Sequence, residues 1–223
     1  MYYDHIYLSR RPRQHHKLVD NNSIYNQNQF KFISEIAREV NKIKFIKDIW
    51  MKKYPECYGS YQKIYSTNYH DFFYNDLTGI PKLTPDKGFT LVNPHIEIIP
   101  GKILLNADPL SSLQRNMGKY IIAGALLIAR DITSNDMGKF QLFSPMWDKI
   151  LIIPDAPVHL ELNIAKDLIQ FKIDYKLSQV YIFIAALNEN GDPLTYSETI
   201  SPFIPIPSAI INEMSFSNET LIK

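Results

Sequence analysis

The sequence predicts an α+β protein, in which an N-terminal extended arm and a helical hairpin precede an antiparallel β-sandwich of the immunoglobulin or fibronectin type. Three observations predict it. Apolar residues recur at three- and four-residue steps in the first quarter of the chain. From about residue 89 the apolar period changes to two, with frequent turn signals. The β-patterned region is about as long as one sandwich domain.

Residues 1–24 are expected to form a basic extended arm. Pro12 is incompatible with a helix interior, and the turn-like run DNNS ends the segment. Four fixed positive charges fall within eight residues of this arm. They are Arg10, Arg11, Arg13 and Lys17. Such an arm can neutralise phosphates or bind an acidic protein surface.

Residues 25–78 are expected to form a helical hairpin. The first helix is expected to run to Pro55 with one buried apolar face. That face comprises Phe30, Ile33, Ala37, Val40, Ile43 and Ile46. The second helix is expected to carry an aromatic stripe that offers apolar contact to a partner. The stripe comprises Tyr58, Tyr61, Tyr65, Tyr69 and Phe72.

A Pro- and Gly-containing linker is expected at residues 79–88, followed by the sandwich at residues 89–204. The run IEIIPGKILL predicts a hairpin with Pro100 and Gly101 at the centre of a type II turn. The run KYIIAGALLIARDI predicts either a strand pair or one long buried strand, and SPMWDKILIIPDAP predicts a further strand.

Strict alternation gives the clearest strand signal, in the run VHLELNIAKDLIQFKIDY. It predicts two strands, around Val158–Ile164 and Ile169–Tyr175, joined by a short turn. The run VYIFIAAL then predicts a fully buried strand, followed by a turn at Asn190 and Gly191 and an edge strand. Residues 205–223 contain several prolines and are expected to be an extended tail.

Charge is unevenly distributed, although the net charge is only +1. Residues 1–54 hold 11 Lys or Arg against 5 Asp or Glu, and the remainder holds 13 against 18. This asymmetry is typical of an interaction arm. Cys57 is the single cysteine, so an internal disulfide is excluded. The first residues lack the apolar run of a signal peptide, and no apolar run is long enough for a membrane span. We expect synthesis in the cytoplasm and no membrane contact.

No catalytic, cofactor or metal signature is visible in the sequence. The histidines show no HExxH or HxH spacing, and GxSxG, Walker and dinucleotide motifs are absent. His70 is followed directly by the carboxylate of Asp71, and neighbouring helix positions point apart. Four carboxylates of the β region would permit glycoside hydrolysis only if two faced one cleft. They are Glu97, Asp108, Asp155 and Glu161. We therefore expect no enzyme activity, no cofactor and no metal.

The order of these parts resembles an uncharacterised family of small Bacteroidetes proteins. The resemblance rests on the basic arm, on the Q-x-x-F pattern from Gln29 to Phe32, and on the runs IEIIPGKILL and VYIFIAALNENGDPLTYSE. It covers roughly residues 8 to 200. It implies a C-terminal β-sandwich and a structural or interaction role, and it supplies no catalytic residues.

The expected function is that of a structural component of a multi-subunit assembly, such as a bacteriophage virion or a tail-like particle. The partners would be further copies of the chain and other subunits. The positive arm of one copy would contact the negative sandwich of the next, and such a contact closes into rings or propagates. Two alternatives stay open. One is binding of a glycan or receptor through sandwich-end loops and Trp147, and the other is nucleic-acid binding through the arm.

Overall fold

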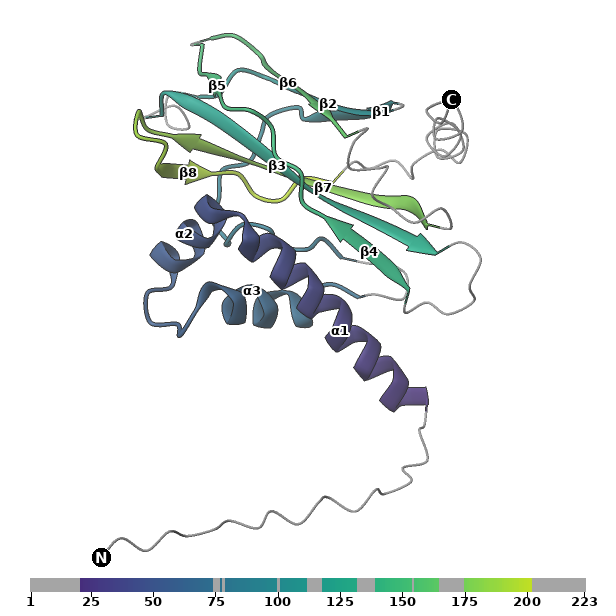
Figure 1. The fold of residues 1–223 in the computed structure, drawn as a ribbon. Coiled ribbons are helices and arrows are strands. Elements are labelled where there is room, and N and C mark those ends of the chain that lie inside the picture. The colour runs from purple at the N-terminus through teal and green to yellow at the C-terminus, as the bar shows by residue number, and fades with distance from the viewer. Residues whose placement is uncertain are drawn as a thin grey trace, which may run out of the picture.

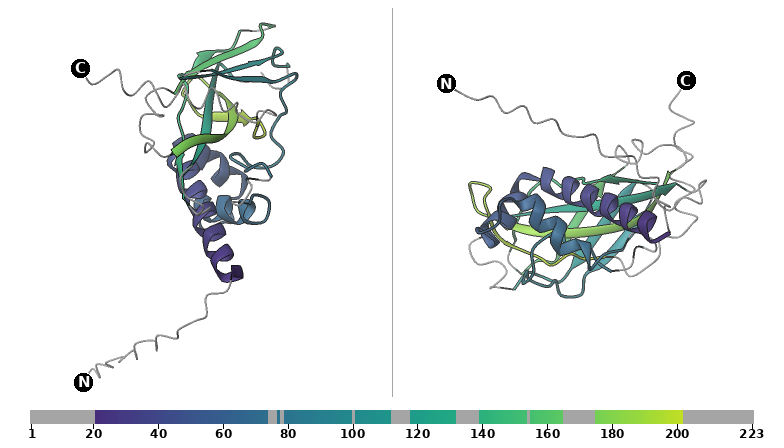
Figure 2. Two further views of the ribbon diagram at one scale, coloured as in Figure 1. Left: turned by 90° about the vertical axis from the view of Figure 1, so that its right-hand side faces the viewer. Right: turned by 90° about the horizontal axis from the view of Figure 1, so that it is seen from below.

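The computed structural model describes residues 21–73, 77, 79–99, 101–111, 118–131, 139–153, 155–164 and 175–201. In this part of the chain, three helices and two antiparallel sheets stack as three layers (Figure 1). Helices form one outer layer, the larger sheet lies in the middle, and the smaller sheet forms the other outer layer (Figure 2). The predicted α+β class is confirmed, and the two sheets are compatible with a β-sandwich. The four basic residues of the predicted arm and the predicted tail lie outside the described residues.

The first predicted helix is two helices, α1 (Asn21–Lys42) and α2 (Lys44–Lys53). Ile43 separates them because its backbone is extended, with φ −77° and ψ 105°. The change of direction at Ile43 lets both helices place apolar side chains on the same sheet. Ile36 of α1 and Ile46 of α2 accordingly belong to one buried cluster.

The second predicted helix is α3 (Ser60–Tyr69), which runs back alongside α1 (Figure 1). Gln29 of α1 is buried, and its Nε2 donates to the carbonyl oxygens of Tyr69 (3.1 Å) and Phe72 (2.7 Å). The first bond satisfies a carbonyl at the C-terminal end of α3 that has no partner within the helix, and the second holds the chain that follows α3. Phe32, three residues further along α1, is buried against the large sheet. The Q-x-x-F pattern is thus part of the helix packing.

The expected linker at residues 79–88 is packed between the helices and the large sheet. Leu83 is buried, and its carbonyl accepts a hydrogen bond from Nε1 of Trp50 (3.0 Å). The buried Asn68 side chain accepts from the Lys82 N–H (2.6 Å) and donates to the Lys82 carbonyl (3.2 Å). A segment held in this way does not act as an exposed connection between independent units.

The large sheet has the strand order β4-β3-β7-β8. Its members are β3 (Tyr120–Asp131), β4 (Phe140–Phe143), β5 (Ile150–Leu151), which also pairs with β3, β7 (Tyr175–Leu187) and β8 (Pro193–Tyr196). The run from residue 120 is therefore one long strand. The Asn-Gly turn between β7 and β8 is confirmed, with Gly191 at φ 87°. The short strand β4 was not predicted, because four residues are too few to show a period.

The small sheet consists of β1 (His95–Ile99), β2 (Lys102–Ala107) and β6 (Val158–Asn163) in that order. The predicted β1–β2 hairpin is confirmed, and Gly101 has the positive φ, 73°, that a type II turn requires at that position. The strand expected at residues 169–175 lies outside the described residues except for Tyr175, which begins β7 in the other sheet.

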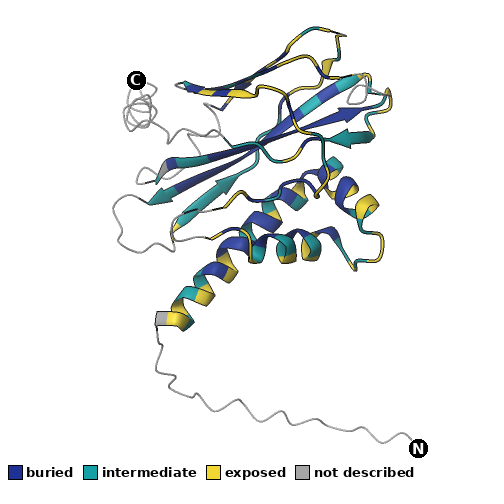
Figure 3. Cartoon of the chain, turned by 180° about the vertical axis from the view of Figure 1, so that it is seen from behind, coloured by how far each residue is buried: buried dark blue, intermediate teal, exposed yellow. Residues whose placement is uncertain are grey.

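Two apolar cores hold the layers together, and buried residues accordingly concentrate between the layers (Figure 3). Ala123, Ala125 and Leu127 of β3 face the small sheet, whereas Leu126 and Ile128 face the helices. Because both faces of the large sheet are covered, its central strands are apolar over residues 121–129 of β3 and 180–187 of β7. The outer face of the small sheet is polar, which explains the strict alternation in β6.

Candidate functional site

An exposed aromatic patch lies where α1 and α3 run side by side. We define this aromatic patch as Phe30 of α1 together with Tyr61, Tyr65 and Tyr69 of α3. Helix positions four residues apart share a face, so the three tyrosines form a row. Phe30 reaches this row from α1, with its ring centroid 5.5 Å from that of Tyr65, and the Tyr65 and Tyr69 rings are 5.4 Å apart. Phe30 is 57% exposed, so the patch offers a large apolar area to solvent.

The three phenol groups influence one another electrostatically. Partial burial raises the pKa of Tyr65 above its ordinary value, and the neighbouring phenols of Tyr69 and Tyr61 raise that pKa further. A phenolate at Tyr65 is therefore disfavoured. The Tyr65 hydroxyl consequently stays protonated at physiological pH, and it can donate and accept hydrogen bonds.

The rim of the aromatic patch is polar and uncharged. Asn22, Ser23, Asn26 and Gln27 line, together with Phe30 and Tyr69, a shallow hollow of about 610 Å³. Aromatic rings bordered by amide and hydroxyl groups, with no charge at the centre, are typical of protein-binding surfaces. The hollow also adjoins the first turn of α1, to which the predicted basic arm is connected in sequence.

The structure brings together three of the five aromatic residues that the sequence singled out. Tyr58 lies in the turn before α3, is fully exposed, and does not belong to the row. Phe72 is a correction, because its side chain is fully buried and contacts the rings of Phe32 (5.4 Å) and Tyr181 (5.5 Å). Since α3 ends at Tyr69, the chain turns Phe72 onto the large sheet, where no partner can reach it.

Phe30 is the member of the aromatic patch that sequence reasoning misplaced. It was expected on the buried face of the first helix together with Ile33, whereas the structure buries Phe32 beside Ile33 and leaves Phe30 exposed. Two phenylalanines two positions apart cannot both face the same core in a helix. Burial of the polar Gln29 rotates the helix so that Phe30 points to solvent, and no periodicity of apolar residues predicts that.

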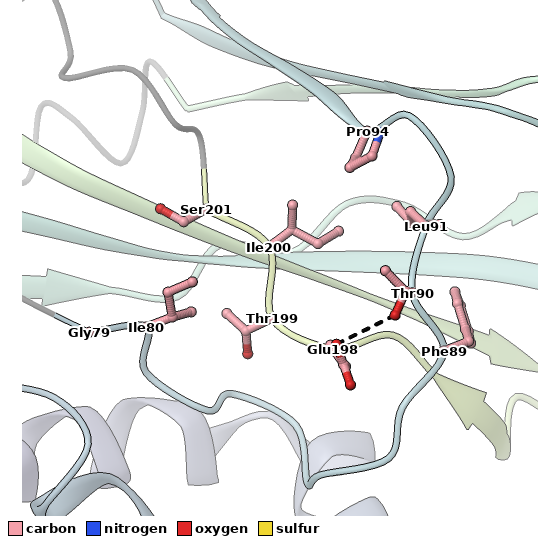
Figure 4. A pocket seen from close by; sticks show the side chains of 10 residues that line it. All are labelled: Gly79, Ile80, Phe89, Thr90, Leu91, Pro94, Glu198, Thr199, Ile200 and Ser201. Atoms are coloured by element: carbon pink, nitrogen blue, oxygen red, sulfur yellow. Dashed lines mark hydrogen bonds between the residues drawn. The ribbon is translucent and has the colours of Figure 1, made fainter.

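A second hollow, of about 470 Å³, opens beside Ser201 at the end of the described chain (Figure 4). Its walls are mainly apolar, with Ile80, Phe89 and Ile200 among the lining residues. Glu198 is the one titratable side chain among the described lining residues, and its Oε2 accepts a hydrogen bond from Thr90 at 3.5 Å. Among the described lining residues, Glu198 is thus the one side chain that could give or take a proton near neutral pH.

The remaining chemical candidates are dispersed over the structure. Asp71 pairs with Lys82 (3.3 Å) rather than with His70. Glu97 and Glu161 both pair in register with Leu104, so the middle strand of the small sheet separates them. Within the described ranges, no three His, Cys, Asp or Glu side chains are grouped so that they could hold a metal ion.

Trp147 corrects one part of the glycan-binding alternative. Its side chain is 5% exposed and belongs to the core between the two sheets, so it offers no platform on which a sugar could stack.

None of the described helices is long and apolar enough to cross a membrane.

Comparisons with known proteins give one weak likeness. No family model and no curated protein matches the chain. Among solved structures, a DUF3823 family protein from Parabacteroides merdae ATCC 43184 is similar over 53% of this chain and 53% of its own, with 14% sequence identity and a TM-score of 0.27. The chain thus spans about half the length of that protein. The resemblance to a Bacteroidetes family is supported only as this weak structural match.

Proposed function

We propose that the protein is a non-enzymatic assembly subunit that binds a second copy of itself through the aromatic patch. The observation that carries this proposal is the row of the exposed Tyr61 and the half-buried Tyr65 and Tyr69, which the exposed Phe30 extends and uncharged polar side chains border. Aromatic residues are enriched at the centres of protein interfaces, where charged residues are depleted.

The rings suit this role energetically. Phe and Tyr side chains bury large areas while losing only two side-chain torsions, so the entropic cost of contact is low. Phe30 and Tyr61 expose ring surface to water in the isolated chain, and covering them with a partner removes that unfavourable contact. The tyrosine hydroxyls supply hydrogen bonds at the edge of such an interface.

The arm supports the same proposal through its charge. Arg10, Arg11, Arg13 and Lys17 lie 4 to 11 residues before α1, and α1 begins next to the aromatic patch. An extended chain spans at most about 3.3–3.6 Å per residue, so the arm can contact a copy that is docked on the patch. A bacteriophage virion or tail-like particle is the setting in which we propose that this assembly occurs.

Light scattering of the full chain tests the proposal. We expect the wild type to show a species larger than the 25.9 kDa monomer, and Phe30→Gln and Tyr61→Gln to shift it toward the monomer. Glutamine keeps a good helix propensity, so α1 and α3 should stay intact. Tyr58→Gln is the matched control, because Tyr58 is exposed but lies outside the row, and its mass distribution should equal that of the wild type.

Two results would contradict the proposal. A wild-type protein that stays monomeric at every concentration would exclude self-association. Selective binding of one sugar on a glycan array, lost in Phe30→Gln, would instead assign the aromatic patch to a glycan, since rings bordered by amides can also bind sugars.

A further inference from the structure

Lysines concentrate on α2, at the end of the helix layer that lies away from the start of α1. Helix α2 alone carries Lys44, Lys47, Lys52 and Lys53 against the single carboxylate of Asp48. All four lysines are exposed, because Ile46, Ile49 and Trp50 form the buried face of this helix. In Figure 1, α2 and the start of α1 lie at opposite ends of the layer.

These lysines have no ionic partner among the described residues. The lysines that do form ion pairs there are elsewhere, for example Lys102 with Glu161 and Lys119 with Glu189. Asp48 and Glu56, the exposed carboxylates of this region, form no ion pair with any described cation. Several like charges close together repel one another, and a polyanion would relieve that repulsion.

Aromatic rings accompany the lysines in the turn between α2 and α3. Lys63 Nζ lies 4.3 Å from the ring centroid of Tyr54, a cation–π contact, which adds a fifth cation to the surface. Tyr58, four residues further along the turn, has a relative exposure of 102%. Such a ring packs against nothing in the fold, so both of its faces are open to a planar ligand.

We propose that this surface, Lys44, Lys47, Lys52, Lys53, Lys63 and Tyr58, binds single-stranded nucleic acid. The lysines contact backbone phosphates without reading sequence, and the Tyr58 ring stacks on an unpaired base. Lysines around an open aromatic ring are the combination that single-strand binding requires, because phosphate contacts provide affinity and stacking holds the bases. A helix of ten residues is about 15 Å long, enough to follow a few successive phosphates.

Fluorescence anisotropy with a labelled 20-nucleotide oligo-dT tests this site in the full-length protein. Each phosphate contact on a single strand contributes about −0.7 to the slope of log K against log salt. The triple variant Lys44→Gln, Lys47→Gln, Lys52→Gln should therefore make the slope shallower by about 2. Removing the stacking ring in Tyr58→Ala should weaken binding on the order of tenfold at fixed salt.

A matched control separates this site from a general effect of charge. The variant Lys102→Gln, Lys119→Gln, Lys139→Gln removes the same charge from lysines that form ion pairs, and it should bind oligo-dT like the wild type. An equal loss in both triple variants would overturn the proposal. So would loss of binding only when residues 1–20 are deleted, because the arm would then be the binding element.

An acidic protein is the competing partner for such a surface, and poly-glutamate distinguishes it. If poly-glutamate displaces oligo-dT at equal charge concentration and Tyr58→Ala has no effect, an acidic protein is the partner and the proposal is wrong. Failure of the nucleic-acid proposal would leave the proposal of self-association through the aromatic patch unaffected. The light-scattering mass of the α2 variants should equal that of the wild type, because none of the substituted lysines belongs to the aromatic patch.

Discussion

Asn68 shows how one buried side chain connects two elements that are distant in sequence. Its amide donates to the Ile64 carbonyl (2.8 Å) within α3 and forms the reciprocal pair of hydrogen bonds with the backbone of Lys82. The chain around Lys82 has no strand neighbour at this point, so Asn68 takes the place of one. Burial makes these bonds important, because an unpaired polar group away from water is costly.

Replacing Asn68 with alanine should destabilise the fold by about 1–3 kcal/mol. The substitution leaves the Lys82 N–H and carbonyl without their side-chain partner in a partly buried position. Urea unfolding followed by circular dichroism measures the change. Ser66→Ala is the control, because its exposed hydroxyl bonds the Lys63 carbonyl and should matter by less than about 0.5 kcal/mol. Equal midpoints for Asn68→Ala and the wild type would contradict the assigned role.

Tyr181 makes the stability of the fold sensitive to alkaline pH. Burial raises the pKa of its phenol far above the ordinary value of 10, although nearby Arg130 opposes the shift. Burial also raises the pKa of Tyr196. Above pH 10 the unfolded chain loses these protons while the folded chain keeps them. The stabilising contribution is therefore complete below pH 10 and decreases as the pH rises further.

The Tyr181→Phe variant should lose less stability than the wild type between pH 9 and about pH 11. A group that is ionised in the unfolded chain and protonated in the folded chain changes the free energy of unfolding by about 1.4 kcal/mol per pH unit. The free energy of unfolding of the wild type should therefore fall more steeply with pH than that of the variant, by up to that amount. Urea midpoints measured across this range test the prediction. Parallel pH profiles for the two proteins would show that another group governs the alkaline transition.

At the scale of the elements, the period of apolar residues predicted whether a segment is a helix or a strand. It was less informative about which elements pack against each other. Alternation in β6 follows from one buried and one solvated face, and the sequence contains that information directly. The apolar run of β3 left open a strand pair or a single strand. Only the presence of two covering layers decides between them, and those layers come from residues far away in the chain.

The segment at residues 79–88 illustrates why its packing could not be predicted. Its prolines and glycines are typical of an exposed connection. In the structure, Thr84 Oγ1 donates to the Ser197 carbonyl (2.7 Å) and the Leu83 N–H donates to Thr199 Oγ1 (2.9 Å). Both partners lie more than a hundred residues away, so no local pattern could reveal the contact.

Gly88 permits the close approach of this segment to the chain that follows β8. A Cβ on Gly88 would lie 2.7 Å from the Ser197 carbonyl carbon, so Gly88→Ala must push the two backbones apart. That movement disturbs the hydrogen bonds of Phe89 with Tyr196 (2.8 Å) and Glu198 (3.0 Å). We expect a loss of about 1–3 kcal/mol in urea unfolding.

Gly59→Ala is the matched control for that substitution. A Cβ on Gly59 would meet no atom within 4 Å, and its φ of 172° is extended backbone that any residue adopts. Its stability should therefore stay within about 0.5 kcal/mol of the wild type. If both glycine variants lose the same stability, steric contact at Ser197 is not the cause.

For the whole molecule, the sequence predicted which kinds of surface exist better than it predicted which residues form them. The tyrosine row was visible as an i, i+4 pattern, because α3 is regular over those residues. Phe30 and Phe72 exchanged roles, since the rotation of α1 and the turn after α3 are set by tertiary packing. The first quarter of the chain carries an excess of positive charge, and the α2 lysines that belong to it are all exposed.

The arm gives the last prediction, which concerns the assembled state. If its four basic residues bind the negative surface of a neighbouring copy, the mass measured by light scattering should depend on salt. The Debye length shortens from about 10 Å at 0.1 M to about 3 Å at 1 M, so a large species at low salt should fall to the 25.9 kDa monomer at high salt.

Deletion of residues 1–20 should give that monomer at every salt concentration, with the circular dichroism of the fold unchanged, because the described residues from Tyr25 onward already form two extensive apolar cores. A truncated protein that assembles like the full chain would show that the aromatic patch acts without the arm. A full-length protein that is monomeric at every salt concentration would direct the search to another partner, to be captured with a peptide of residues 1–20.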